Sequence, residues 1–166
     1  MPKAPSKSPM TIEEREKLRT ICLELPDNFV AVELGSGKGC STRIIGKIAK
    51  AKHGHLYTID KVDYKLRRRR TKNLPVTFIQ GDTQRVEWQD EIHLLWIDAL
   101  HTYQGLFDDL ERWGPFVKKD GFILGHDYVN LKSVRRASMD YAKKTDKLFL
   151  ITPTMFLIVK KEMVGE

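Results

Sequence analysis

Acidic and imidazole side chains follow two apolar runs of the sequence at similar positions. Asp98 and His101 come shortly after one run, and His126 and Asp127 come directly after the next. The ends of neighbouring strands lie about 5 Å apart, so Asp98, His126 and Asp127 can converge on one divalent cation. Carboxylates favour magnesium or calcium, whereas an imidazole ligand shifts the preference toward manganese, iron or zinc. Such a cation can hold a hydroxyl group and lower its pKa while His101 removes the proton.

A structural role is the alternative for each of these residues. A lone histidine beside an apolar run is usually packed or hydrogen-bonded, and His93, which lies inside a run, is interpreted in this way. The shared position of Asp98, His101 and Asp127 after strands favours a functional site. Both interpretations stay open for His126.

A glycine-rich segment, Gly35-Ser36-Gly37-Lys38-Gly39, follows the first apolar run, and a helical pattern begins at Ser41. Glycines at such a turn allow a tight bend and the close approach of a ligand. The dinucleotide fingerprint would need glycine where the chain has Cys40, and the phosphate-loop pattern is absent. The segment therefore indicates a nucleotide-like cofactor of another kind.

Two aspartates follow the next two apolar runs. Asp60 ends the second run, 25 residues after Gly35, and its carboxylate can accept hydrogen bonds from two ribose hydroxyls. Asp82 follows the third run and can accept one from an exocyclic amine such as that of adenine. Either aspartate alone is more simply a turn residue, but three signals at successive strand ends favour a nucleoside site.

The elements that must position these residues alternate along the chain. Strands are expected at 29–34, 56–59, 76–80, 92–97 and 122–124, and helices at 11–25, 41–52, 62–73, 103–117 and 131–145. Short apolar runs between amphipathic segments indicate a parallel sheet buried on both faces. The predicted fold is a doubly wound α/β domain.

Two further runs, 148–152 and 155–159, are separated only by Pro153-Thr154. So short a connection excludes a parallel crossover, and an antiparallel hairpin added to the sheet is expected. Residues 1–10 contain three prolines, two serines and two lysines, a composition typical of a flexible tail. Residues 11–166 are expected to form a single domain.

The composition of 41% hydrophobic and 31% charged residues over 166 positions suits one buried core. No window approaches the roughly 18 to 20 apolar residues of a membrane span, and no apolar run follows the basic N-terminus. Cys22 and Cys40 are too few for a disulfide framework. A cytoplasmic protein with reduced thiols and no membrane partner is expected.

Twenty-nine Lys and Arg against 22 Asp and Glu give a net charge of +7, which favours polyanions. Much of the excess lies in residues 61–72, where Asp63 is the one acid. This run can contact phosphates, as in nucleic-acid-binding proteins. The simpler interpretation is a solvated helix face whose long side chains cover apolar neighbours.

With the glycine segment, Asp60, Gly81-Asp82 and the terminal hairpin, residues 28–160 resemble the class I S-adenosylmethionine-dependent methyltransferases. The resemblance implies a seven-stranded sheet with one antiparallel strand and S-adenosylmethionine as cofactor, its amino-acid part against the glycines. The residues implied in cofactor binding are Glu33, which lies beneath the cofactor, and Gly35, Ser36, Gly37, Gly39, Asp60, Asp82 and Asp98.

The surroundings of Asp98 and Asp127 resemble one branch of that superfamily, the metal-dependent O-methyltransferases of catechols and macrolide sugars. This resemblance implies metal ligation by Asp98, His126 and Asp127, with His101 as the base. The catechol enzymes carry lysine at the position of His101, so the sugar-acting enzymes match better. The sequence departs from the family at His126, where an acid is usual.

The leading hypothesis is an enzyme that transfers a methyl group from S-adenosylmethionine to a hydroxyl of a small-molecule acceptor, assisted by Mg, Mn or Ca and by His101. A second hypothesis takes RNA or another nucleic acid as the acceptor, with residues 65–72 as phosphate contacts. A third is a non-catalytic cofactor-binding protein. The sequence names neither the acceptor nor the oligomeric state.

Overall fold

The computed structural model describes residues 9–160 of the chain, and seven strands form one sheet in the order β3-β2-β1-β4-β5-β7-β6. The strands are β1 (Val30–Leu34), β2 (His55–Asp60), β3 (Val76–Gln80), β4 (Ile92–Ile97), β5 (Val117–Gly125), β6 (Asp146–Leu150) and β7 (Phe156–Lys160). The helices are α1 (Ile12–Leu23), α2 (Cys40–Ala51), α3 (Lys65–Arg70), α4 (Tyr103–Trp113) and α5 (Lys132–Thr145), with a 3-10 turn, η1 (Gly114–Phe116).

The sheet has the predicted mixture of parallel and antiparallel pairing. Strands β1 to β5 pair in parallel, and β7 runs antiparallel to both of its neighbours, β5 and β6. The prediction of a doubly wound α/β sheet with a C-terminal antiparallel hairpin is confirmed. Because β7 lies between β5 and β6, the hairpin extends the sheet at one edge.

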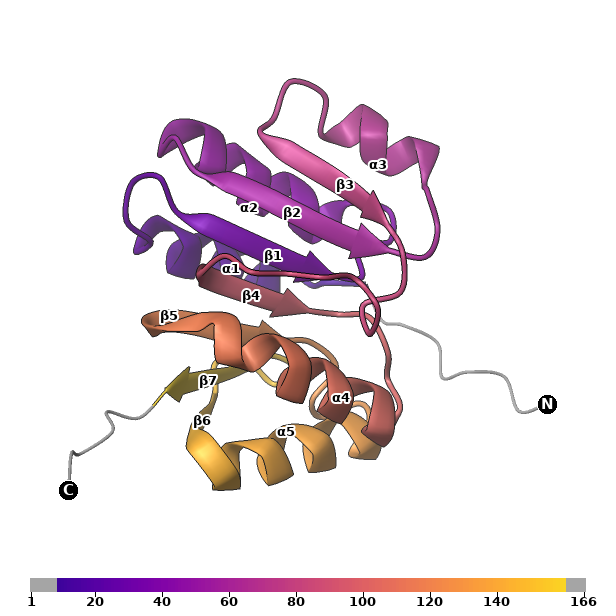
Figure 1. Ribbon diagram of the computed structural model, residues 1–166, viewed down its shortest axis with the longest axis vertical. Coiled ribbons are helices and arrows are strands. Elements are labelled where there is room, and N and C mark those ends of the chain that lie inside the picture. Colours follow the sequence, from indigo (N-terminus) through magenta and orange to yellow (C-terminus); the bar gives the residue numbers. More distant parts are fainter. Residues whose placement is uncertain (1–8, 161–166) are drawn as a thin grey trace.

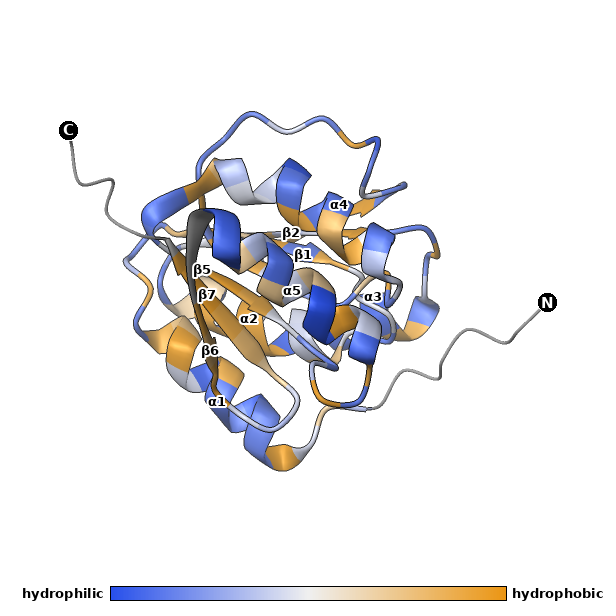
Figure 2. Ribbon diagram, turned by 90° about the horizontal axis from the view of Figure 1, so that it is seen from below, coloured by the Kyte–Doolittle hydropathy of each residue, from blue (hydrophilic) through white to orange (hydrophobic). Residues whose placement is uncertain are grey.

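Helices cover both faces of the sheet (Figure 1). On the face of α1 and α2, Leu18 and Ile45 pack in one core cluster with Leu94 of β4. On the other face, Leu106 of α4 and Val134 of α5 belong to a second cluster. Figure 2 shows the apolar strands enclosed between helices whose outer faces are hydrophilic. Both faces of the sheet are therefore buried, as its continuous apolar runs predict.

The N-terminal segment differs from the expected tail where the structure describes it. Residues 1–8 lie outside the described residues, but Met10 is buried and packs in the cluster beneath α1. Thr11 caps α1 in a capping box with Glu14. Across residues 9–160, every helix is too short or too polar to cross a lipid bilayer.

Two predicted helices are longer than the observed ones. The helix expected at 62–73 is reduced to α3, because the Val62 amide donates to Asp60 Oδ1 in a turn and Asn73 adopts a φ of 64°. The helix expected at 103–117 ends at Trp113, because Pro115 has no amide hydrogen to continue it. Strand β5 then begins at Val117, earlier than predicted.

Asp109 of α4 is a buried carboxyl whose titration should affect stability. It accepts a hydrogen bond from Thr83 Oγ1 at 2.7 Å, and burial raises its pKa to about 6 from 3.8. The folded protein therefore binds this proton more tightly than the unfolded chain, so stability falls as the pH rises from about 4 to 6. We expect Asp109→Asn to stabilise the protein by about 1 to 2 kcal/mol at pH 7 and little at pH 4.5.

Urea denaturation at the two pH values measures this difference, with Asp108→Asn on the same helix as the matched control. An equal effect of Asp109→Asn at both pH values would show that Asp109 does not titrate between them.

Candidate functional site

The residues singled out in the sequence follow strands whose carboxyl ends meet at one edge of the sheet (Figure 1). Backbone hydrogen bonds continue the pairing beyond these ends. The Gly35 amide donates to the Ile59 carbonyl at 2.8 Å, and the Asp98 amide donates to the Leu34 carbonyl at 2.8 Å. The loops that carry the site are therefore held to the sheet at their first residues.

The loop between β1 and α2 needs glycine at both of its ends. Gly35 and Gly39 have φ angles of 82° and 81°, in the left-handed region that side chains rarely adopt. A Cβ atom on Gly35 would also overlap the carbonyl oxygen of Asp98. The glycines thus bring the loop directly against the segment that follows β4.

Glu33 lies fully buried under this loop. Its carboxylate accepts hydrogen bonds from the hydroxyls of Ser41, Thr42 and Thr58, the last two at 2.7 Å. These bonds join β1 to β2 and to the first turn of α2. Glu33 therefore supports the loop from below, and its expected place beneath the cofactor stays a prediction.

Asp60 faces the same loop from the end of β2. Its Oδ2 accepts hydrogen bonds from the amides of Ser36 and Gly37 at 3.0 and 2.9 Å, and its side chain is 14% exposed. The carboxylate thus fixes the shape of the loop and keeps a small surface toward solvent. That Asp60 binds ribose hydroxyls stays a prediction.

Asp82 lies after β3, and its side chain is 30% exposed. The Gln84 amide donates to its carboxylate at 3.1 Å, and Lys61 Nζ lies 3.1 Å from it. The hydrogen bond from Gln84 and the Lys61 ammonium hold the pKa of Asp82 below its ordinary value. Asp82 is therefore an ionised acceptor at the edge of the sheet, and its contact with adenine stays a prediction.

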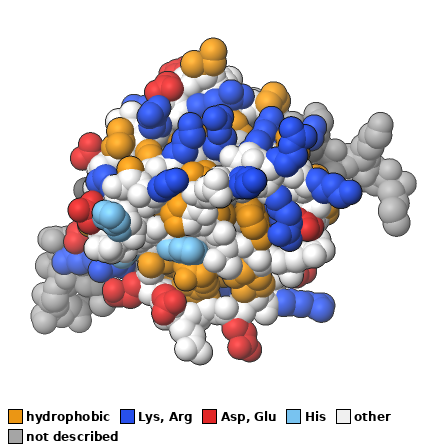
Figure 3. Space-filling view, turned by 90° about the horizontal axis from the view of Figure 1, so that it is seen from above, with side chains coloured by type: hydrophobic (Ala, Val, Ile, Leu, Met, Phe, Trp, Pro, Cys, Tyr) orange, Lys and Arg blue, Asp and Glu red, His pale blue; other side chains and the backbone are white. Residues whose placement is uncertain are grey.

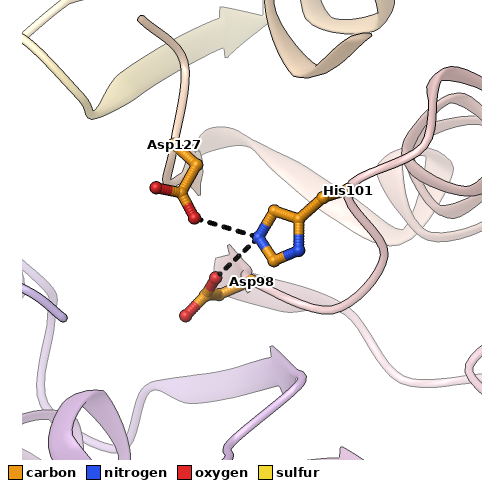
Figure 4. Close-up of side chains that lie close together, drawn as sticks. All are labelled: Asp98, His101 and Asp127. Atoms are coloured by element: carbon orange, nitrogen blue, oxygen red, sulfur yellow. Dashed lines mark hydrogen bonds and ion pairs between the residues drawn. The ribbon is translucent and has the colours of Figure 1, made fainter. Parts of the chain in front are cut away.

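Asp98, His101 and Asp127 converge on one point (Figure 4). His101 Nε2 lies 3.3 Å from Asp98 Oδ1 and 3.1 Å from Asp127 Oδ2. One possible ligand atom from each residue lies within 4.8 Å of the others. Two carboxylates and one imidazole at this spacing suit a divalent cation, and the imidazole favours manganese, iron or zinc over magnesium.

The two carboxylates control the charge of His101. Hydrogen bonds to Asp127 and then Asp98 raise the pKa of the imidazole to about 9, against the opposing effect of burial. At neutral pH the ring therefore carries a positive charge that balances part of the negative charge of the carboxylates. A cation bound by the same carboxylates would take over this balancing role.

Asp127 adopts an uncommon backbone conformation for a residue other than glycine. Its φ is 62°, and its side chain is 2% exposed. The Asn130 side chain donates to Asp127 Oδ1 at 3.3 Å. Strained positions of this kind are concentrated at functional sites, and here the conformation turns the carboxylate toward His101.

His126 lies beside this group, and its expected place among the metal ligands stays a prediction. Its Nε2 lies 3.1 Å from Glu14 Oε1 of α1, and its side chain is 1% exposed. Its Nδ1 lies 3.5 Å from Asp127 Oδ2, the oxygen that also faces His101, so His126 borders the group from the side of α1. Burial lowers the pKa of His126, but Asp127, Asp98 and Glu14 outweigh this effect and raise it.

The basic run is divided between buried and exposed positions. Arg67 is buried, and its guanidinium donates to Ser36 Oγ of the glycine loop and to Asp63 Oδ1 at 3.2 Å. It also lies over the ring of Phe78. Arg68 pairs with Asp63 at 2.9 Å. Residues 65–72 therefore do not form a continuous phosphate-contacting stripe, and Arg67 supports the loop instead.

The sequence of the chain matches one protein-family model. The family model described as a methyltransferase domain matches residues 32–128, which run from β1 to the end of the Asp98, His101 and Asp127 group. A search of curated protein sequences found no significant match.

Solved structures share the whole fold at low sequence identity. The O-methyltransferase NovP is 18% identical with a TM-score of 0.72, and the match covers 95% of this chain and 83% of that one. A candidate rRNA methylase from Clostridium thermocellum is 13% identical with a TM-score of 0.73, over 93% and 100% of the two chains. The SAH-bound methyltransferase PaMTH1 of Podospora anserina is 15% identical with a TM-score of 0.69, over 94% and 81%.

At these identities the structural likeness concerns the fold, whereas the family model covers more than half of the chain. The loop geometry, the strand order and the family match lead to one assignment. The chain belongs to the methyltransferase-domain family and has the fold of the S-adenosylmethionine-dependent methyltransferases.

Proposed function

We propose that the protein transfers the methyl group of S-adenosylmethionine to a hydroxyl oxygen of a small-molecule acceptor. The observation that carries this proposal is the convergence of Asp98, His101 and Asp127 beside the glycine loop. The group touches the loop directly, because Gly35 packs against the backbone of Asp98. Acid and base residues therefore lie next to the place where the cofactor is expected.

The cofactor would lie along the carboxyl ends of β1, β2 and β3. Backbone atoms of Gly35, Ser36 and Gly37 line its amino-acid part, Asp60 accepts from the ribose, and Asp82 accepts from the adenine amine. When bound, the cofactor supplies an electrophilic methyl group on a sulfonium sulfur. The chain contributes a fixed loop whose shape Glu33 and Asp60 hold by hydrogen bonds.

The group of Asp98, His101 and Asp127 would take up the proton that the acceptor hydroxyl loses. The C–S bond breaks with its electron pair on sulfur, the C–O bond forms, and His101 accepts the hydroxyl proton in its neutral form, which is the minor form at neutral pH because its pKa is about 9. Asp98 and Asp127 then stabilise the imidazolium through the contacts at 3.3 and 3.1 Å. A divalent cation held by Asp98 and Asp127 would supply charge that lowers the pKa of the hydroxyl.

RNA methylation is the second candidate, favoured by the net charge of +7 and by the likeness to the candidate rRNA methylase. The division of the basic run weakens it, since Arg67 is buried and Arg68 is paired with Asp63. A small acceptor is therefore preferred.

Calorimetric titration with S-adenosylhomocysteine tests the cofactor site without knowledge of the acceptor. We expect one-to-one binding that Asp60→Asn weakens by about tenfold or more, because a charge-assisted acceptor is lost. Asp120→Asn, an exposed change on β5, is the matched control and should leave the affinity unchanged. Equal affinities of the two variants would contradict the role of Asp60.

Methyl transfer itself is tested with labelled S-adenosylmethionine and a panel of hydroxylated small molecules, with added Mn²⁺ and with chelator. Label on a hydroxyl oxygen supports the proposal. Label found only on nitrogen or on RNA would contradict it. Equal rates with Mn²⁺ and with chelator would show that the reaction does not use a divalent cation.

A further inference from the structure

A cavity of about 780 Å³ opens beside the glycine loop, between α1 and the first turns of α2. Its lining includes six cationic side chains: Arg15, Arg19, Lys38, Arg43, Lys47 and Arg70. Two acids, Glu16 and Asp98, also line it. The cavity therefore carries a large local excess of positive charge.

The six cations are exposed, and no carboxylate within residues 9–160 forms a salt bridge with any of them. Arg15 Nε donates to the Met10 carbonyl at 3.1 Å, and Arg70 donates to the Lys38 carbonyl at 3.1 Å. These bonds hold two guanidinium groups in place without neutralising them. Figure 3, a view onto the end of the molecule with β3 and α3, shows Lys and Arg side chains gathered on its surface.

The cofactor does not account for this charge. S-adenosylmethionine has one carboxylate, and its sulfonium and ammonium groups are themselves positive. Ser36 and Gly37 line the cavity, so the amino-acid part of the cofactor would meet its edge, but Asp60 and Asp82, which are proposed to bind its ribose and adenine, do not line it. One carboxylate leaves most of the six cations unbalanced, which suits a second, more strongly anionic molecule.

The remaining lining limits the kind of anion. Met10, Ile44 and Ile48 provide an apolar floor, and Tyr64 provides an aromatic side chain. The volume lies within the range of about 300 to 1,000 Å³ that is typical of small-molecule sites. Arg43 and Lys47 project from α2, whose N-terminal amides also favour an anion.

Asp98 links this cavity to the chemistry, since it lines the cavity and belongs to the group with His101 and Asp127. We propose that the methyl acceptor is a small phosphorylated molecule whose phosphate binds among Arg43, Lys47 and the neighbouring cations while its hydroxyl reaches Asp98. This inference rests on the proposed function and names the substrate class. Transfer places the methyl group on the hydroxyl, leaves the phosphate unchanged and gives the proton to His101.

Inorganic pyrophosphate is the probe for the anion site, titrated into the full chain in the presence of S-adenosylhomocysteine. We expect one equivalent to bind and the double variant Arg43→Gln with Lys47→Gln to weaken binding by about tenfold or more, because charged hydrogen bonds are lost. Lys50→Gln, on the same helix but outside the cavity, should have no effect. Unchanged affinity for S-adenosylhomocysteine shows that the double variant is folded.

Three outcomes would overturn the inference: no pyrophosphate binding, equal weakening by Lys50→Gln, or tight binding of single-stranded RNA that pyrophosphate does not displace. The last would carry a salt dependence of about 0.7 log units per phosphate and point to RNA. Methylation of neutral hydroxylated molecules without pyrophosphate binding would contradict this inference but support the proposed function. Pyrophosphate binding that depends on Arg43 and Lys47, without any hydroxyl methylation, would support the anion site but contradict the proposed function.

Discussion

Replacing His101 with asparagine is expected to slow methyl transfer by about 10²- to 10⁴-fold, the range for a lost general base. The affinity for S-adenosylhomocysteine should stay within about twofold, since His101 acts on the acceptor side of the site. The imidazole lies within 3.3 Å of both carboxylates, so the substitution removes the base that they would stabilise as an imidazolium. Initial rates with labelled S-adenosylmethionine, together with calorimetry, measure the two effects separately.

His53→Asn is the matched control, because it removes an exposed histidine at the opposite end of β2. Asparagine tolerates the φ of 55° at this position, and the rate should be unchanged. Asp127→Asn should reproduce the loss seen with His101→Asn, since its carboxylate lies 3.1 Å from the imidazole. If His101→Asn kept most of the parent rate, the reaction would not use this group.

The parts of the site that local sequence determines could be predicted. Gly35 and Gly39 adopt the positive φ angles that the glycine segment requires, and Asp98 and Asp127 follow adjacent strands. Both results depend only on turn chemistry and on the rule that parallel strands end at one edge of a sheet. The convergence of Asp98, His101 and Asp127 follows from the same rule.

The side of the sheet on which each residue lies was harder to predict. His126 and Asp127 are neighbours in sequence, and their proximity to Asp98 suggested a shared ligand set. His126 follows directly after β5, and its ring lies near Trp96 and Glu14 on the side of α1 while its Nδ1 still lies 3.5 Å from Asp127. Counting alternation from Leu124, which is in the α1-side core, would have assigned His126 to that face.

Composition could not predict which charged side chains are buried and which line the cavity. Arg67 is the first of four consecutive arginines, yet it alone of the four is buried, where it contacts Ser36 and Phe78. The cavity cations come from α1, the glycine loop, α2 and α3, so only the tertiary structure brings them together. Spacing gives one usable signal, since Arg43 and Lys47 are four residues apart on one helix face.

Replacing Glu14 with alanine is expected to lower the free energy of unfolding by about 3 to 5 kcal/mol, as for a buried ion pair that loses one partner. Glu14 is 3% exposed, and its two carboxylate oxygens make different contacts. Oε2 accepts from the Thr11 amide at 2.6 Å in the capping box, and Oε1 lies 3.1 Å from His126 Nε2. The variant therefore leaves a buried imidazole without this carboxylate.

Thr11→Ala separates the two contributions, because it removes the capping hydroxyl but keeps the contact between Glu14 and His126. Loss of a cap costs about 1 kcal/mol, so Glu14→Ala should be clearly the more destabilising change in urea denaturation. Equal losses in the two variants would mean that the contact with His126 contributes nothing. A larger loss for Glu14→Ala would show that α1 is held to the end of β5 through His126, next to the residue that turns its carboxylate toward His101.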